Sequence, residues 1–171
     1  SCTRVAHVKG IVTAGEVESS PLTPGIERMP AKLVMLPANA RARRVAVEER
    51  QRRLAEFAES APLNRVEEGD GQIGFIAAGT SYLYVKEAFP QAAVLKLGMV
   101  NPLPEKLIRD FAARVEKLYV VEDLDPFLEN QIKAMGIACV GKEVIPAIGE
   151  LSAAVVRQAI SGQAPAELFA P

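Results

Sequence analysis

The residues best placed to bind a ligand lie where an apolar run is expected to give way to a helix. They are Gly79, Thr80 and Ser81, directly after the run at 73–78. Backbone N–H groups at the start of a helix are donors that bind anions, and ligands of α/β proteins bind at the carboxyl edge of the sheet. The three residues are therefore a candidate anion or ligand site. Ordinary capping by Thr80 or Ser81 is the simpler interpretation.

An acidic cluster follows a second apolar run, at 118–121. Glu122, Asp123 and Asp125 supply the oxygen ligands that a hard cation prefers. A solvated turn followed by a helix explains the same residues, with Asp125 as the cap and Pro126 in the first helical position. We favour this second interpretation.

The triplet Gly69-Asp70-Gly71 resembles the opening of the magnesium motif of thiamine diphosphate enzymes, in which asparagines follow the aspartate some way along the chain. Asn101 lies at about the required separation. In that motif, however, the triplet follows a strand, whereas here it precedes one, and a strand and a helix separate it from Asn101. We interpret the triplet as a hairpin turn.

The remaining reactive side chains are few. His7 is the only histidine, with no nucleophile suggested near it, and we expect a surface or interface role. Cys2 and Cys139 are far apart and are typical of reduced thiols in a cytoplasmic protein. Cys139 lies in an apolar context and is expected to be a small buried hydrophobe. We assign no catalytic, cofactor-binding or metal-binding residue to this chain.

Composition excludes several classes of protein. The chain has 171 residues, of which 49% are hydrophobic and 5% aromatic, with no tryptophan. This content suits one core of aliphatic side chains and is too high for a disordered chain. The formal net charge of −1 argues against nucleic-acid binding, which needs a basic surface. No apolar run is as long as a membrane-spanning helix.

The first third of the chain is expected to differ from the rest. Residues 1–37, rich in glycine and proline, are predicted to form an arm or linker. Residues 38–63 are predicted to be a connecting helix, regular over 38–61, with Asn39 as its cap. A helix this polar often bridges parts of a structure or packs on a partner. Its arginines suit phosphate groups, but pairing with Glu48 and Glu49 at i, i+4 spacing, or a subunit contact, is the simpler explanation.

Residues 64–171 are predicted to form an α/β domain. Apolar and periodic runs predict strands at 64–67, 73–78, 93–97, 118–121 and 137–140, and helices at 80–89, 104–115, 126–135 and 150–160. The buried stripe of the third of these helices is expected to contain Phe127, Leu128, Ile132 and Met135. Alternating strands and helices indicate a three-layer α/β/α fold with a mostly parallel, roughly five-stranded sheet.

Four consecutive stretches of the chain resemble the α subunits of the indolepyruvate:ferredoxin oxidoreductases. They are LVMLPANARARRVAVEERQRRLAEFAESAPLNRVE, IGFIAAGTSYLYVKEAF, LKLGMVNPLPEKLIRDFAARVEKLYVVEDLDPFLENQIKAMGI and GKEVIPAIGEL. The resemblance covers about residues 1–160. It implies that 1–37 continue from a preceding pyrimidine-type domain and that 64–171 form a transketolase C-terminal-like domain.

The resemblance also implies a larger enzyme. Such a subunit binds thiamine diphosphate with Mg²⁺, carries 4Fe–4S clusters and pairs with a small β subunit. The enzyme oxidatively decarboxylates indolepyruvate and other aryl pyruvates, transfers the acyl group to coenzyme A and reduces ferredoxin. The family's magnesium and cluster motifs have no matching positions in this chain, so no functional residue is carried over.

Two hypotheses follow. The first is a non-catalytic domain that positions the neighbouring thiamine-binding domains and the partner subunit, inactive by itself. The alternative is a module that binds coenzyme A or a nucleotide at Gly79, Thr80 and Ser81. The start at Ser1 rather than Met favours a piece of a longer protein, although N-terminal processing would give the same start.

Overall fold

A computed structural model of the chain describes residues 11, 13, 15, 25 and 27–162. The chain divides into two compact units, residues 1–51 and 52–171. Most of the predicted arm lies outside the described residues, as do His7 and Cys2.

The first unit contains helix α2 (Pro30–Leu33) and the first part of helix α3 (Pro37–Ser60). The helix predicted over 38–61 is thus confirmed to within one residue at each end, and Pro37 occupies the first position, where its missing N–H does no harm. The predicted cap is wrong. Asn39 lies inside the helix, and its Nδ2 donates to the carbonyl oxygen of Val34 at 2.9 Å. The expected i, i+4 pairing is present between Arg44 and Glu48.

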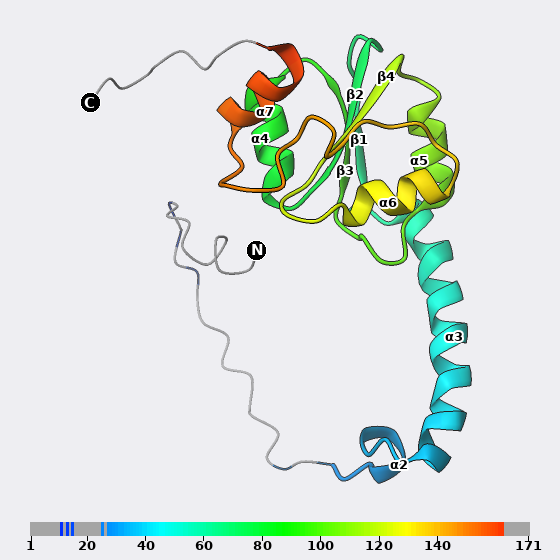
Figure 1. Cartoon of the computed structure of the whole chain (residues 1–171). Coiled ribbons are helices and arrows are strands. Elements are labelled where there is room, and N and C mark those ends of the chain that lie inside the picture. The colour runs from blue at the N-terminus through cyan, green and yellow to red at the C-terminus, as the bar shows by residue number, and fades with distance from the viewer. Residues whose placement is uncertain (1–10, 12, 14, 16–24, 26, 163–171) are drawn as a thin grey trace. The chain divides into compact units, whose positions relative to one another are not determined.

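The second unit contains the sheet (Figure 1). Its strands are β1 (Arg65–Glu67), β2 (Ile73–Ala78), β3 (Ala93–Leu97) and β4 (Lys117–Val121). Its helices are α4 (Thr80–Ala88), α5 (Glu105–Ala112), α6 (Phe127–Ala134) and α7 (Ala153–Ser161). The strand order is β1-β3-β2-β4. β2 is parallel to both β3 and β4, and β1 is antiparallel to β3 at the edge.

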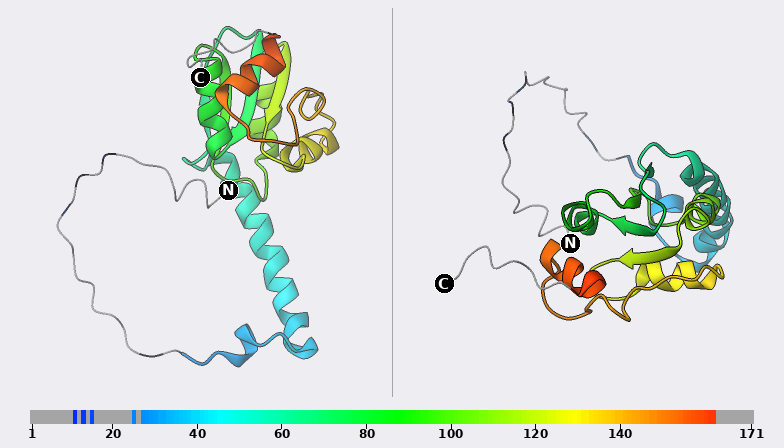
Figure 2. Two further views of the ribbon diagram at one scale, coloured as in Figure 1. Left: turned by 60° about the vertical axis from the view of Figure 1, so that its left-hand side comes forward. Right: turned by 90° about the horizontal axis from the view of Figure 1, so that it is seen from above.

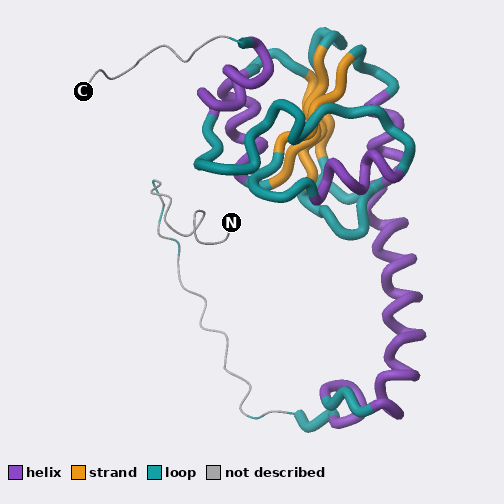
Figure 3. The backbone as a smooth tube through the Cα atoms, in the orientation of Figure 1, coloured by secondary structure: helices purple, strands orange, loops and turns teal. Residues whose placement is uncertain are grey.

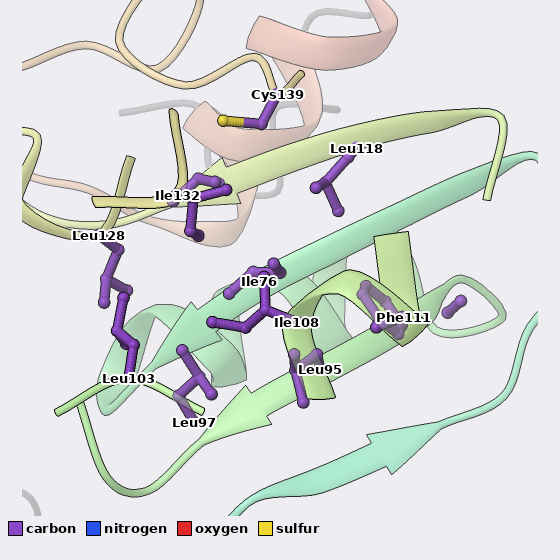
Figure 4. Packing of buried hydrophobic residues seen from close by; sticks show 12 residues of the cluster. Ile76, Leu95, Leu97, Leu103, Ile108, Phe111, Leu118, Leu128, Ile132 and Cys139 are labelled. Carbon is purple, nitrogen blue, oxygen red and sulfur yellow. The ribbon is translucent and has the colours of Figure 1, made fainter. Parts of the chain in front are cut away.

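Helices cover both faces of the sheet, which confirms the three-layer α/β/α architecture (Figure 2). One face packs against α5 and α6, and the other against α4 and α7. Successive residues of β4 point to opposite faces, so Val120 joins the first cluster and Val121 the second. Because both faces are covered, β2 and the buried part of β4 have continuous apolar sequences rather than alternating ones. Figure 4 shows the first cluster, where Ile108 and Phe111 of α5 pack over Ile76 and Leu95.

The fifth strand predicted at 137–140 is wrong: four strands are present among the described residues. Val140 alone bridges to β4, exchanging backbone hydrogen bonds of 2.9 Å with Leu118 and Val120. The chain turns immediately afterwards, because the carbonyl of Gly141 accepts from the N–H groups of Val144 and Ile145. Figure 3 shows the long stretch between α6 and α7 mostly as loop.

Candidate functional site

The candidate site is the carboxyl edge of the sheet. Because β2, β3 and β4 are parallel, the loops that follow them emerge at this edge. Each loop leads into a helix, α4 after β2, α5 after β3 and α6 after β4. Each helix presents backbone N–H groups without intrahelical partners in its first turn. What satisfies those donors decides whether the edge is available to a ligand.

The donors of α6 are satisfied by Glu122, the residue directly after β4. Its Oε2 accepts from the N–H of Leu128 at 2.8 Å, and its Oε1 from the N–H of Glu129 at 3.0 Å. Glu122 is 9% exposed, so this carboxylate is part of the interior. A carboxylate at a helix N-terminus is stabilised by the hydrogen bonds and by the helix dipole. The expected cap, Asp125, is wrong, because the cap residue of α6 is Pro126 and the carboxylate comes from Glu122.

The donors of α5 are satisfied from outside the sheet, by Glu59 near the end of α3. Its carboxylate oxygens accept from the N–H of Lys106 at 3.0 Å and of Leu107 at 2.9 Å. Asn64 completes the connection. Its Oδ1 accepts from the N–H groups of Gly98 and Met99, both at 3.0 Å, and its Nδ2 donates to a carbonyl of α3 at 2.8 Å. The end of α3 therefore holds the β3–α5 loop in place.

The cap residue of helix α4 makes no side-chain hydrogen bond to the first turn. Its cap residue is Gly79, so the predicted capping by Thr80 or Ser81 is wrong. Gly79 is exposed, has φ of 57°, and a Cβ at this position would meet no atom within 4 Å. Open space therefore lies beside Gly79 on the side where a side chain would project. Ser81 is only 4% exposed, whereas Thr80 is half-buried and Gly79 is exposed.

A network of charged side chains, centred on Glu129 and Lys133, connects α6 to the loop that follows Val140. Glu129 is 4% exposed, and its carboxylate accepts from Lys133 Nζ at 2.7 Å and from the N–H of Lys142 at 2.8 Å. Burial opposes ionisation of Glu129, but these hydrogen bonds outweigh it and hold its pKa below the ordinary value. Lys133 also pairs with Glu143 at 3.1 Å, and its two carboxylate partners raise its pKa.

The acidic cluster is divided between the interior and the surface. Glu122 is buried in its capping role, whereas Asp125 is exposed. Within 27–162 and the four described residues before them, no group of three or more His, Cys, Asp or Glu side chains is arranged to hold a metal ion. Cys139 belongs to the core, where burial raises the pKa of its thiol.

The Gly69-Asp70-Gly71 triplet lies at the opposite edge from Asn101. The triplet precedes β2, whereas Asn101 follows β3, and the two strands are parallel. Asp70 Oδ1 accepts from the N–H of Gln72 at 3.0 Å, which is the local bond of a turn. The prediction of a turn is confirmed. The hairpin is wrong, since β1 pairs with β3 and not with β2.

No helix in the described part of the chain is both long and apolar enough to cross a membrane.

Comparison with solved structures places the fold in a known class. The chain is similar to 2-oxoglutarate:ferredoxin oxidoreductase from Magnetococcus marinus, with a TM-score of 0.58 at 19% identity, over 74% of this chain and 23% of that one. At this identity the likeness shows the fold: that of one region of a 2-oxoacid:ferredoxin oxidoreductase. No family model matches the chain.

Curated relatives confirm the resemblance found in the sequence. The chain is 40% identical to the indolepyruvate oxidoreductase subunit IorA of Archaeoglobus fulgidus, over 81% of its own length and 23% of that subunit. It is 34% identical to the IorA subunit of Methanothermobacter marburgensis, over 94% of its length and 28% of the relative. The chain is thus a homologue of one region of the indolepyruvate oxidoreductase subunits named IorA, and it spans about a quarter of their length.

Proposed function

We propose that this chain is a non-catalytic domain of an indolepyruvate:ferredoxin oxidoreductase, where it positions neighbouring catalytic regions. The whole enzyme would oxidatively decarboxylate indolepyruvate, form an acyl-coenzyme A and reduce ferredoxin. Homology to IorA subunits over most of the chain supports this proposal. Thiamine diphosphate with its Mg²⁺, and the 4Fe–4S clusters, would be held by regions of the subunit other than this chain, and a small second subunit would complete the enzyme.

The observation that carries the structural role is the internal capping at the carboxyl edge. In α/β proteins this edge usually binds the ligand. Here Glu122 and Glu59 occupy the helix N-termini of α6 and α5, so those donors stabilise the fold instead of a substrate. We propose three functional segments: 1–37 as the arm from a preceding domain, 38–63 as the connecting helix, and 64–171 as the transketolase C-terminal-like domain.

Calorimetry on this chain tests the proposal. Titration with thiamine diphosphate and Mg²⁺ should give no saturable heat, because the donors of α5 and α6 already have partners within the fold. A saturable heat would contradict a non-catalytic role. The matched positive control is the full-length subunit, prepared anaerobically with its small partner, which should bind the cofactor.

One observation favours a second candidate function, at the N-terminus of α4. The cap residue of α4 is an exposed glycine with open space beside it, which suits the approach of an anionic group such as a phosphate of coenzyme A or a nucleotide. Thr80→Asp would place a carboxylate over the first-turn N–H groups without disturbing the buried Ser81. Saturable coenzyme A binding that Thr80→Asp abolishes would establish this function, and no heat with the wild-type chain would exclude it.

A further inference from the structure

The loop between β4 and α6 forms a rigid, exposed apolar projection, here called the β4–α6 knob and defined as residues 123–127. Leu124 is 70% exposed and Phe127 is 52% exposed. The sequence predicts Phe127, together with Leu128 and Ile132, in the buried stripe of α6; Leu128 and Ile132 are buried, but Phe127 is not. At the base of the knob, Lys142 Nζ donates to the carbonyl of Glu122.

The backbone of the knob is strained. Leu124 has φ of 59°, and it is the one non-glycine residue with positive φ among those described. The left-handed region is unfavourable for a branched side chain such as leucine. Strain of this kind persists where the surroundings fix it and is associated with binding and catalytic sites. Here the strain holds an apolar side chain out in solvent, where it contributes nothing to the core.

The surroundings do fix the knob. Glu122, at its base, is buried and bonded to two N–H groups of α6. Gly141 lies so close to the carboxylate of Glu129 that a Cβ there would collide with it, and the N–H of Lys142 donates to the same carboxylate at 2.8 Å, which holds the loop after Val140 against α6. The exposed position of Leu124 and Phe127 is therefore built into the fold. A preorganised apolar projection loses little conformational entropy when it is bound.

The charge around the knob selects the kind of partner. Residues 123–127 carry two acidic side chains, the half-buried Asp123 and the exposed Asp125, and no basic one. The lysines behind it are engaged within the fold, Lys133 with two glutamates and Lys142 with the carbonyl of Glu122. An acidic rim repels nucleic acid and anionic lipid, both of which need basic surfaces. It also disfavours pairing with the same face of a second copy.

We propose that the β4–α6 knob docks into an apolar socket rimmed by lysine or arginine on another region of the same subunit. This inference rests on the proposed function: the knob is the surface through which the domain would contact and position its neighbours. A region of the same polypeptide is the favoured partner, because tethering gives it a high effective concentration. In the Archaeoglobus fulgidus relative, 23% of the subunit matches this chain, and the rest of that polypeptide supplies candidate surfaces. Exposed aromatic and aliphatic side chains within a polar rim are the usual anatomy of such contacts.

Photo-crosslinking in the full-length subunit, assembled with its small partner, tests the proposal. Phe127→benzoylphenylalanine should crosslink to a peptide of the same subunit outside this chain, at roughly five times or more the yield of Leu83→benzoylphenylalanine. Leu83 is the matched control, because it is 60% exposed on α4, which covers the opposite face of the sheet from α6. No crosslink from position 127, or a crosslink only to a second copy or to the small subunit, would overturn the proposal.

Two further variants separate the possible failures. Leu124→Gly should leave the urea midpoint of this chain unchanged or raise it, since glycine adopts positive φ without strain, while it reduces the crosslink yield from position 127. A lower midpoint would mean that Leu124 serves the fold, which would contradict the docking role. Val45→benzoylphenylalanine, at a 69% exposed position of α3, tests independently of the knob whether this domain contacts neighbouring regions. Crosslinks from position 45 without any from position 127 would leave the proposed function standing and the knob proposal refuted.

Discussion

Three helices begin at the same edge of the sheet, and their N-termini differ. The N–H groups of α5 and α6 bind carboxylates of the protein itself, whereas the cap residue of α4 is a glycine, which has no side chain to offer its first turn. The two carboxylates join elements together, since Glu59 ties α3 to α5 and Glu122 ties the end of β4 to α6. In this domain, an edge that commonly binds ligands in α/β proteins serves instead to connect secondary-structure elements through capping carboxylates.

The largest effect is expected from removing the buried carboxylate of α6. Glu122→Ala leaves two buried N–H groups without partners and should lower the free energy of unfolding by about 3 kcal/mol. Urea denaturation followed by circular dichroism measures it. Asp125→Ala, in the exposed part of the same loop, is the control and should change stability by less than about 0.5 kcal/mol. Equal effects of the two substitutions would mean that α6 is not closed by Glu122.

The second effect concerns the closure of α5. Glu59→Ala removes a less buried carboxylate that links two elements, so we expect a loss of about 1.5 kcal/mol. Glu56→Ala, one turn earlier on the exposed surface of α3, is the matched control. Hydrogen exchange should show faster exchange at Lys106 and Leu107 in Glu59→Ala alone. Unchanged exchange at these two amides would contradict the assignment of Glu59 as their partner.

The third effect concerns the N-terminus of α4. Gly79→Ala forces an L-residue into a backbone with φ of 57°, and we expect a loss of about 1 kcal/mol from backbone strain. No clash adds to the loss, because the Cβ would enter open space. Thermal unfolding measures the change. A loss as large as that in Glu122→Ala would indicate that the α4 terminus is packed and closed like the other two.

The smallest effect is a pH dependence of the stability that arises from the network of Glu129 and Lys133. The pKa of Glu129 lies below its ordinary value of 4.5, so ionised Glu129 stabilises the fold. This contribution is complete above the ordinary pKa and is lost as the pH falls through the lowered one. The stability difference between wild type and Glu129→Gln should therefore shrink as the pH falls from 7 into this acidic range. Denaturant midpoints measured across that range test it, with Glu116→Gln as the surface control. A difference that grows on acidification would contradict the sign.

The sequence predicts the elements well and their connections poorly. Strands β2 and β3 have the predicted bounds, because each is a mainly apolar run between turn residues, as expected of a buried parallel strand. Glu122 could have been found from its place between a buried strand and a helix, but local patterns favoured Asp125, the nearer residue. Glu59 gave no local signal, since it caps a helix 48 residues further along the chain. Phe127 follows the helical period of its neighbours, yet its position at the start of α6 leaves it exposed.

The non-catalytic role of this domain is tested most directly by dye reduction with the full-length subunit, expressed anaerobically with its small partner. Indolepyruvate- and coenzyme A-dependent reduction of a viologen is measured for wild type and for the double variant Ser81→Ala, Asn101→Ala, which alters two polar side chains of the carboxyl edge and spares the capping residues and the knob. If this domain is non-catalytic, wild type reduces the dye, and the kcat of the variant stays within about twofold of it. A fall in kcat of roughly 100-fold or more with assembly intact would place catalytic groups in this chain and contradict the proposed non-catalytic role.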